Sequence, residues 1–163
     1  MRDPQVENVY SAERVAFEDE GFTNTLTKKQ VENKVWDVLG SDFVANLIEE
    51  NDFVKEVSED FLIITNDKRY KYSQANVNGI VFADGARSLI ILLHEIAHSL
   101  TMSSFETGFT PSGEEFTCHG PHFAFVYLEL VQEFLGIDAG LDLIAGFITF
   151  GVDFTPKEVR KKI

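Results

Sequence analysis

Two histidines four residues apart are the clearest chemical feature of this sequence. They open and close the run HEIAH at residues 94–98, and the chain has four histidines in all. Residues four apart in a helix lie on the same face, so His94 and His98 can reach one cation. Zinc suits two neutral imidazoles, a third protein ligand and one position left for water. The run therefore predicts a zinc site on a helix.

Glu95 lies one residue after the first histidine, about 100° further around a helix. From there its carboxylate can flank the metal without binding it, and can act as a general base that takes a proton from a water molecule. An accidental HExxH is expected about 0.01 times in a chain of this composition, so chance is the weaker explanation. The competing interpretation is a pair of ordinary histidines on a surface or core helix.

Apolar residues surround the run on almost every side. It is preceded by RSLIILL at residues 87–93 and followed by SLT at residues 99–101, which predicts a buried helix rather than an amphipathic one. An unpaired carboxylate or imidazole in such a helix would carry a large desolvation cost. A shared metal ion would supply the missing partners. Asp84 is the expected cap of this helix, and Gly85 the expected turn before it.

A third metal ligand must come from another part of the chain. The extended pattern HExxHxxGxxH is excluded, because Thr101 and Ser104 stand where it needs glycine and histidine. The run CHGPHF at residues 118–123 offers better candidates, since Pro121 predicts the first turn of a helix. One histidine of this run lies at the entrance of that helix and the other inside its first turn. The lone cysteine is more often a small buried apolar residue than a ligand. The candidates are Glu114, Glu115, Cys118, His119, His122 and Glu129.

The two motifs together resemble those of SprT-like zinc metalloproteases, in which HExxH is followed by HGPEF. The resemblance is closer to a group of small metallohydrolases of actinobacteria and their phages, whose chains are of similar length and begin with a segment like residues 2–13. It covers most of the chain, loosely outside the two motifs. It implies a zinc site of His94, His98 and His119 with Glu95 as general base. It also implies a zincin-like fold, in which a strand just before the HExxH helix lines the cleft.

The chain departs from this family pattern at His122, where the pattern usually has glutamate. His122 is therefore a competing ligand. If His119 and His122 both bound the metal, four protein ligands would close the site and leave no position for water. In that case a non-catalytic protein with a structural zinc site becomes the better interpretation.

The charge balance of the chain bears on its partners. Acidic residues outnumber basic ones by 27 to 14, and the net charge is −13. Because nucleic-acid binding depends on lysine and arginine, a nucleic-acid partner is not expected. The basic and aromatic run KRYKY at residues 68–72 is better explained as a solvated strand edge. The single cysteine excludes an internal disulfide and a separate cysteine-rich zinc ribbon.

Length and hydropathy predict one domain over residues 1–163, since 44% of the residues are apolar and a chain of this size can bury a core. The start of the chain lacks an apolar signal segment, and no run of about 18 apolar residues occurs. We therefore expect a cytoplasmic protein without a membrane partner.

Helices come first along the chain, then a small sheet, then the HExxH helix, an order that predicts an α+β fold. The zincin-like fold that the resemblance implies adds that this small sheet packs on the HExxH helix and flanking helices. Helices begin after Thr27 and after Ser41 or Asp42, and a glycine ends each of several helices. We expect turns at residues 66–67 and 78–79 and a long loop at residues 103–118. The expected helices are residues 6–17, 28–39, 42–49, 88–101, 123–135 and 141–150, and the expected strands are residues 61–65, 70–77 and 80–83.

These features predict a zinc-dependent hydrolase that acts on a peptide or protein. An alternative enzyme is a SprT-like protease acting on DNA-bound proteins, which the acidic charge and the missing zinc ribbon make less favourable. Hydrolysis also needs a donor that stabilises the oxyanion beside the metal. The side chains able to donate there are Tyr70, Tyr72, Arg87, His122 and Tyr127.

Overall fold

A computed structural model of the chain describes residues 5–18, 23–67, 71–101 and 118–161. Its elements are mostly helical, with one small three-stranded sheet, so the α+β class is confirmed. The expected loop at residues 103–118 lies almost wholly outside the described residues, as do Glu114, Glu115 and Tyr70.

The described residues form two compact units. The first, here called the helical unit, contains residues 5–18 and 118–161; the second, the sheet unit, contains residues 23–67 and 71–101. A single domain over the whole chain stays a prediction. No helix of the described segments is long and apolar enough to cross a membrane.

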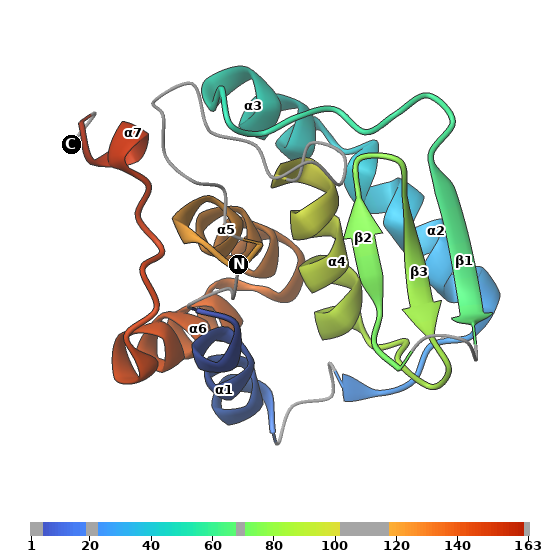
Figure 1. The fold of residues 1–163 in the computed structure, drawn as a ribbon, viewed down its shortest axis with the longest axis horizontal. Helices are drawn as coiled ribbons and strands as arrows, with labels where there is room; N and C mark the ends of the chain where they lie inside the picture. Colours follow the sequence, from blue (N-terminus) through green and yellow to red (C-terminus); the bar gives the residue numbers. More distant parts are fainter. Residues whose placement is uncertain (1–4, 19–22, 68–70, 102–117, 162–163) are drawn as a thin grey trace. The chain divides into compact units, whose positions relative to one another are not determined.

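The sheet unit contains three helices and all three strands (Figure 1). A capping box begins its first helix, in which the Thr27 backbone N–H donates to Gln30 Oε1 at 2.8 Å and Thr27 Oγ1 accepts from the Gln30 N–H at 3.3 Å. The next helix begins after Ser41, whose hydroxyl accepts from the Val44 N–H. The elements are α2 (Lys28–Leu39), α3 (Asp42–Glu50), β1 (Leu62–Asp67), β2 (Gln74–Asn76), β3 (Gly79–Ala83) and α4 (Leu89–Thr101).

Ser88, not Asp84, caps the helix that carries the HExxH run. Ser88 Oγ accepts from the Ile91 N–H at 3.3 Å, and its carbonyl accepts from the Leu92 N–H at 2.9 Å. Asp84 is exposed in the turn after β3, where Gly85 has a positive φ of 78°. The prediction of the cap was therefore four residues too early, while the turn at Gly85 is confirmed.

The sheet has the order β1-β3-β2, with β1 parallel and β2 antiparallel to β3. Asn76 pairs with Gly79, so the hairpin turns at residues 77–78, one residue earlier than expected. A Cβ at Gly79 would lie 2.5 Å from the Leu62 carbonyl oxygen, which explains why glycine begins this strand. The expected turn at residues 66–67 is instead the end of β1. Strands β2 and β3 both contact α4, so the sheet packs on the HExxH helix.

Not every apolar residue at helical spacing faces the core of the sheet unit. Val31, Val35 and Val38 of α2 are buried, but Trp36 is 49% exposed. The Trp36 ring lies edge-on to Phe61, with the ring centroids 5.8 Å apart. A large aromatic side chain at the margin of a face can cover a core residue without being buried itself.

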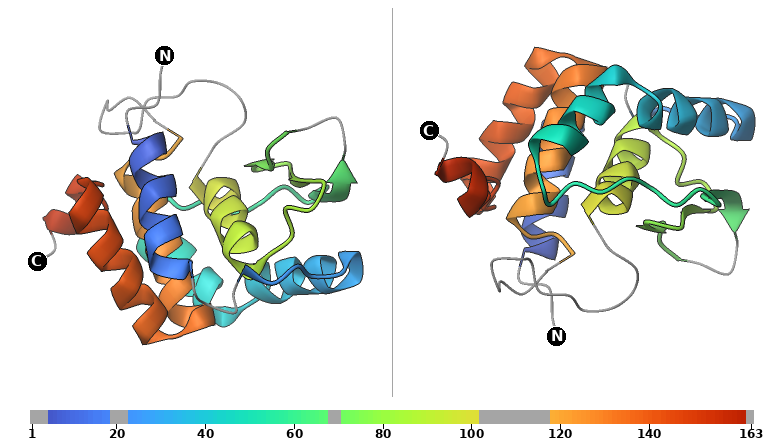
Figure 2. Two further views of the ribbon diagram at one scale, coloured as in Figure 1. Left: turned by 90° about the horizontal axis from the view of Figure 1, so that it is seen from below. Right: turned by 90° about the horizontal axis from the view of Figure 1, so that it is seen from above.

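The helical unit consists of α1 (Val6–Phe17), α5 (Pro121–Leu135), α6 (Ile137–Phe150) and α7 (Lys157–Arg160). Pro121 occupies the first turn of α5, as expected. Backbone N–H groups in the first turn have no partner within the helix, so the N–H that proline lacks is not needed there. Gly136, at φ 101°, joins α5 to α6, and Gly151 ends α6 in the left-handed conformation. Within this unit α6 packs against both α1 and α5 (Figure 2).

The close approach of α1 and α6 gives a prediction about two glycines of α6. Gly140→Ala and Gly146→Ala each gain up to about 1 kcal/mol of helix propensity. The new Cβ at residue 146 would lie 2.9 Å from the backbone oxygen of Ala12, whereas that at residue 140 would lie 2.1 Å from Gln132 Cγ, so the Gln132 side chain must take another rotamer. We expect Gly146→Ala to lose about 1–3 kcal/mol of unfolding free energy from overpacking, and Gly140→Ala to lose less, because only a side chain has to move there. Urea unfolding measures both, and equal stability of the two variants would contradict the packing.

Candidate metal centre

The HExxH residues lie on α4 in its most buried stretch. His94, Glu95 and His98 are 4%, 5% and 7% exposed. The hydroxyls of Ser99 and Thr101 are also buried, and each donates to the carbonyl oxygen four residues earlier. The hydroxyl groups of α4 are therefore hydrogen-bonded within the helix. The two imidazoles and the carboxylate of the same helix are buried from bulk water. This confirms the buried helix predicted from the flanking residues.

The two imidazoles of α4 are arranged as two ligands of one ion would be. His94 Nε2 and His98 Nε2 are 3.2 Å apart, and the rings meet edge to face at 68°. Two nitrogens that each bind a tetrahedral zinc at about 2.0–2.1 Å lie about 3.3–3.4 Å from one another. The observed separation fits that value. The same separation fits a hydrogen bond between two neutral imidazoles.

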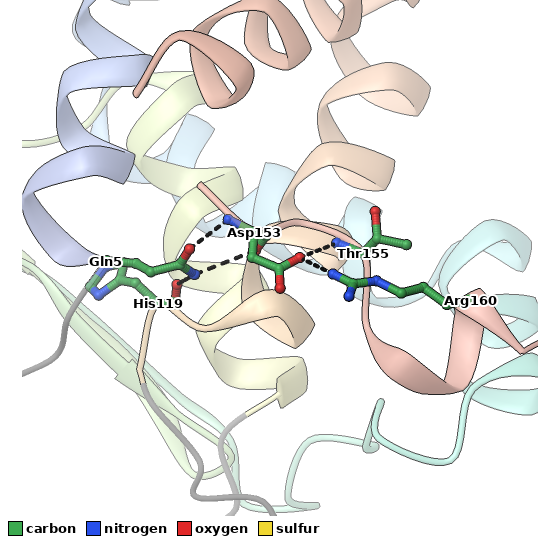
Figure 3. Close-up of polar contacts among 5 residues, drawn as sticks. All are labelled: Gln5, His119, Asp153, Thr155 and Arg160. Atoms are coloured by element: carbon green, nitrogen blue, oxygen red, sulfur yellow. Dashed lines mark hydrogen bonds and ion pairs between the residues drawn. The ribbon is translucent and has the colours of Figure 1, made fainter. Parts of the chain in front are cut away.

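His119 lies in the helical unit, directly before the residue that caps α5. It is 6% exposed, and its ring lies 5.4 Å from that of Tyr10 and 4.9 Å from that of Phe123, between centroids. Its backbone carbonyl accepts a hydrogen bond of 2.9 Å from Gln5 Nε2 (Figure 3). The contacts of His119 with Gln5 and Tyr10 could not be predicted from the sequence, because no local pattern connects residues 5 and 10 with residue 119.

His94, His98 and His119 together form a group that could bind a metal ion. Their ligand nitrogens all lie within 4.8 Å of one another, and all three residues are buried. Among the described residues, no other set of three histidine, cysteine or acidic side chains meets this condition. Neutral imidazole suits zinc, copper, iron and nickel, so the donor set fits a transition metal rather than calcium or magnesium.

His122, the competing ligand, is paired elsewhere. Its Nε2 lies 3.2 Å from Glu158 Oε2 of α7, and the side chain is 9% exposed. Glu129 and Cys118, the other described candidates, are not part of the metal-binding group, and Cys118 is exposed rather than buried as expected. The two histidines of the CHGPHF run therefore have different environments, which the spacing of the sequence did not separate.

Tyr127, considered as an oxyanion donor, is committed to the interior of the helical unit. It is fully buried on α5, and its ring stacks on Phe123 at a centroid distance of 5.7 Å. Burial raises the pKa of its phenol well above the usual value, and the charge of Glu13 and a hydrogen bond to Glu13 raise it further. The hydroxyl is therefore protonated and lies near Glu13 of α1. Because it is buried in the helical unit, Tyr127 has a structural role there.

Two other expected donors belong to the sheet unit. Tyr72 is 65% exposed, with Lys71 Nζ 5.1 Å from the centre of its ring. Arg87 precedes α4, is half-buried, and its backbone carbonyl accepts a hydrogen bond of 2.6 Å from the Leu26 N–H. Arg87 is thus anchored in the segment that leads into the metal-binding helix.

Comparison with known proteins finds no relative. No family model matches the chain, and no similar protein is found among curated proteins or solved structures. The function is therefore inferred from the residues of the site itself.

Proposed function

We propose that this protein is a zinc-dependent hydrolase that cleaves peptide or protein substrates. The observation that carries the proposal is the group of three buried histidines whose nitrogens lie within 4.8 Å of one another. Two of them belong to an HExxH run, which brings a carboxylate to the same buried helix. Three protein ligands with an open fourth position are typical of catalytic zinc, whereas structural zinc is closed by four.

His94, His98 and His119 would hold the zinc as neutral imidazoles. When bound, zinc supplies Lewis-acid chemistry, lowering the pKa of water and polarising a carbonyl group. Glu95 would take the proton of the attacking water and pass it to the leaving group. Its place one residue after a ligand, on a buried turn of α4, keeps it next to the ligands and shields it from bulk water.

His122 is not part of the group whose ligand atoms lie within 4.8 Å of one another, which favours three ligands over four. Its Nε2 instead lies 3.2 Å from Glu158 Oε2 of α7. The non-catalytic alternative, a structural zinc closed by His119 and His122 together, requires a ring nitrogen of His122 to join that group. It remains the second candidate, and the number of histidines needed for binding separates the two.

The proposal includes a zincin-like fold and a relationship to the metallohydrolases that the motifs resemble. A small sheet packed on the HExxH helix is compatible with a zincin-like fold and with the metallohydrolases of actinobacteria and their phages that the motifs resemble. A SprT-like activity on DNA-bound proteins is less favourable, because the net charge of −13 opposes a phosphate-rich partner.

The experiment compares metal-free protein with protein given one equivalent of zinc, on a fluorogenic peptide library and on a denatured protein. We expect cleavage to rise at least about tenfold with zinc, because Lewis-acid activation depends on the metal. We also expect zinc to raise the melting temperature, since it binds the native state. Zinc that stabilises the fold without any cleavage would favour the structural site. Cleavage that appears only when DNA is added would favour the SprT-like activity.

A further inference from the structure

The side-chain amide of Gln5 connects three distant parts of the helical unit (Figure 3). Gln5 Nε2 donates to the carbonyl oxygen of His119 at 2.9 Å and to that of Asp153 at 3.3 Å. Gln5 Oε1 accepts from the Asp153 N–H at 2.5 Å. A primary amide has two N–H groups and one carbonyl, so all three kinds of contact are in use.

The partner of Gln5 on the C-terminal side is itself fixed. Asp153 Oδ1 accepts from the Thr155 N–H at 3.2 Å and from Arg160 Nη2 of α7 at 2.6 Å. The chain of contacts runs from Arg160 through Asp153 and Gln5 to the main chain of His119, as Figure 3 shows. Gln5 is thus held on one side by a bidentate amide contact, and its remaining N–H is directed at His119.

The carbonyl of His119 has no place in the hydrogen bonds of α5. The first acceptor of that helix is Gly120, which accepts from the Ala124 N–H at 3.0 Å. A carbonyl before the cap in a largely buried residue needs another donor, because an unsatisfied buried acceptor is costly. Gln5 supplies that donor. Tyr10, on the helix that Gln5 caps, lies against the imidazole ring of the same residue.

We propose that Gln5 is a positioning residue for the metal ligand His119, acting on its backbone carbonyl. The proposal rests on the proposed function, because it gives His119 the role of third ligand. Outer-shell contacts that orient a ligand typically change metal affinity by about 10–100-fold when removed. The main chain of His119 is fixed by Gln5, and its ring is flanked by Tyr10 and Phe123, so the imidazole is preorganised before metal arrives.

The test uses Gln5→Asn, which keeps the amide but shortens it by one methylene, and Gln5→Leu as a second variant of similar size without polar atoms. Arg160→Met is the matched control, because it removes the last contact of the same chain and leaves the Gln5–His119 hydrogen bond in place. Zinc affinity is measured by competition with a chromogenic chelator, the melting temperature is measured on the metal-free proteins, and Co²⁺ absorption reports the ligand geometry.

We expect both Gln5 variants to weaken zinc binding by about 10–100-fold and to change the Co²⁺ spectrum, while Arg160→Met weakens binding less than about threefold. A Gln5 variant that melts earlier but binds zinc as wild type does would overturn the inference and leave the proposed function standing. Equal weakening by Arg160→Met would assign the effect to general stability and also overturn it. If wild type itself binds no zinc, the proposed function and this inference fail together.

Discussion

Alanine at position 94, 98 or 119 is expected to remove zinc from the purified protein, whereas glutamine at position 122 leaves it bound. Wild type should hold about one zinc per chain, and each of the three alanine variants less than about 0.2, because two imidazoles hold the ion too weakly to survive purification. His122→Gln should retain about one, since His122 Nε2 faces Glu158. Elemental analysis of the four variants, with circular dichroism to confirm folding, gives the answer.

The zinc contents of the variants at positions 119 and 122 show which histidine is the third ligand and whether there is a fourth. His122→Gln also replaces the imidazole that contacts Glu158, so a change in melting temperature does not by itself bear on metal binding. Zinc lost equally at both positions would indicate a closed site of four ligands and favour the structural alternative. Zinc lost at position 122 and kept at position 119 would show that the ligand assignment is wrong.

The sequence predicted the helices well where the capping side chain lies next to the helix that it caps. Thr27 with Gln30, Ser41 and the glycines after α5 and α6 all act within a few residues, and the helix ends follow them. The prediction failed at Ser88, because Asp84 is an equally good cap in isolation and only the geometry of the turn at Gly85 separates them.

In the candidate site, too, local features could be predicted from the sequence and long-range contacts could not. The His94–His98 pair follows from helical periodicity, and its two nitrogens do lie 3.2 Å apart. The different environments of His119 and His122 do not follow from periodicity, because they are set by Gln5 and Glu158, which are 114 and 36 residues away in the chain. Contacts of such sequence separation leave no local pattern, so residues near both chain ends entered the site only through the fold.

The largest change in activity is expected for Glu95→Gln. The amide is nearly isosteric with the carboxylate and removes only the proton acceptor, so turnover should fall by about 10²–10⁴-fold, which is the usual contribution of a positioned general base. Zinc should stay at about one per chain, since Glu95 is not one of the three residues of the metal-binding group. Turnover on a peptide that wild type cleaves, measured beside zinc content, tests both parts.

Equal cleavage by the zinc-loaded variant would point to a contaminating protease or another base. Zinc lost from Glu95→Gln would instead make this buried carboxylate a structural part of the metal site, and the hydrolase proposal would then lose its general base.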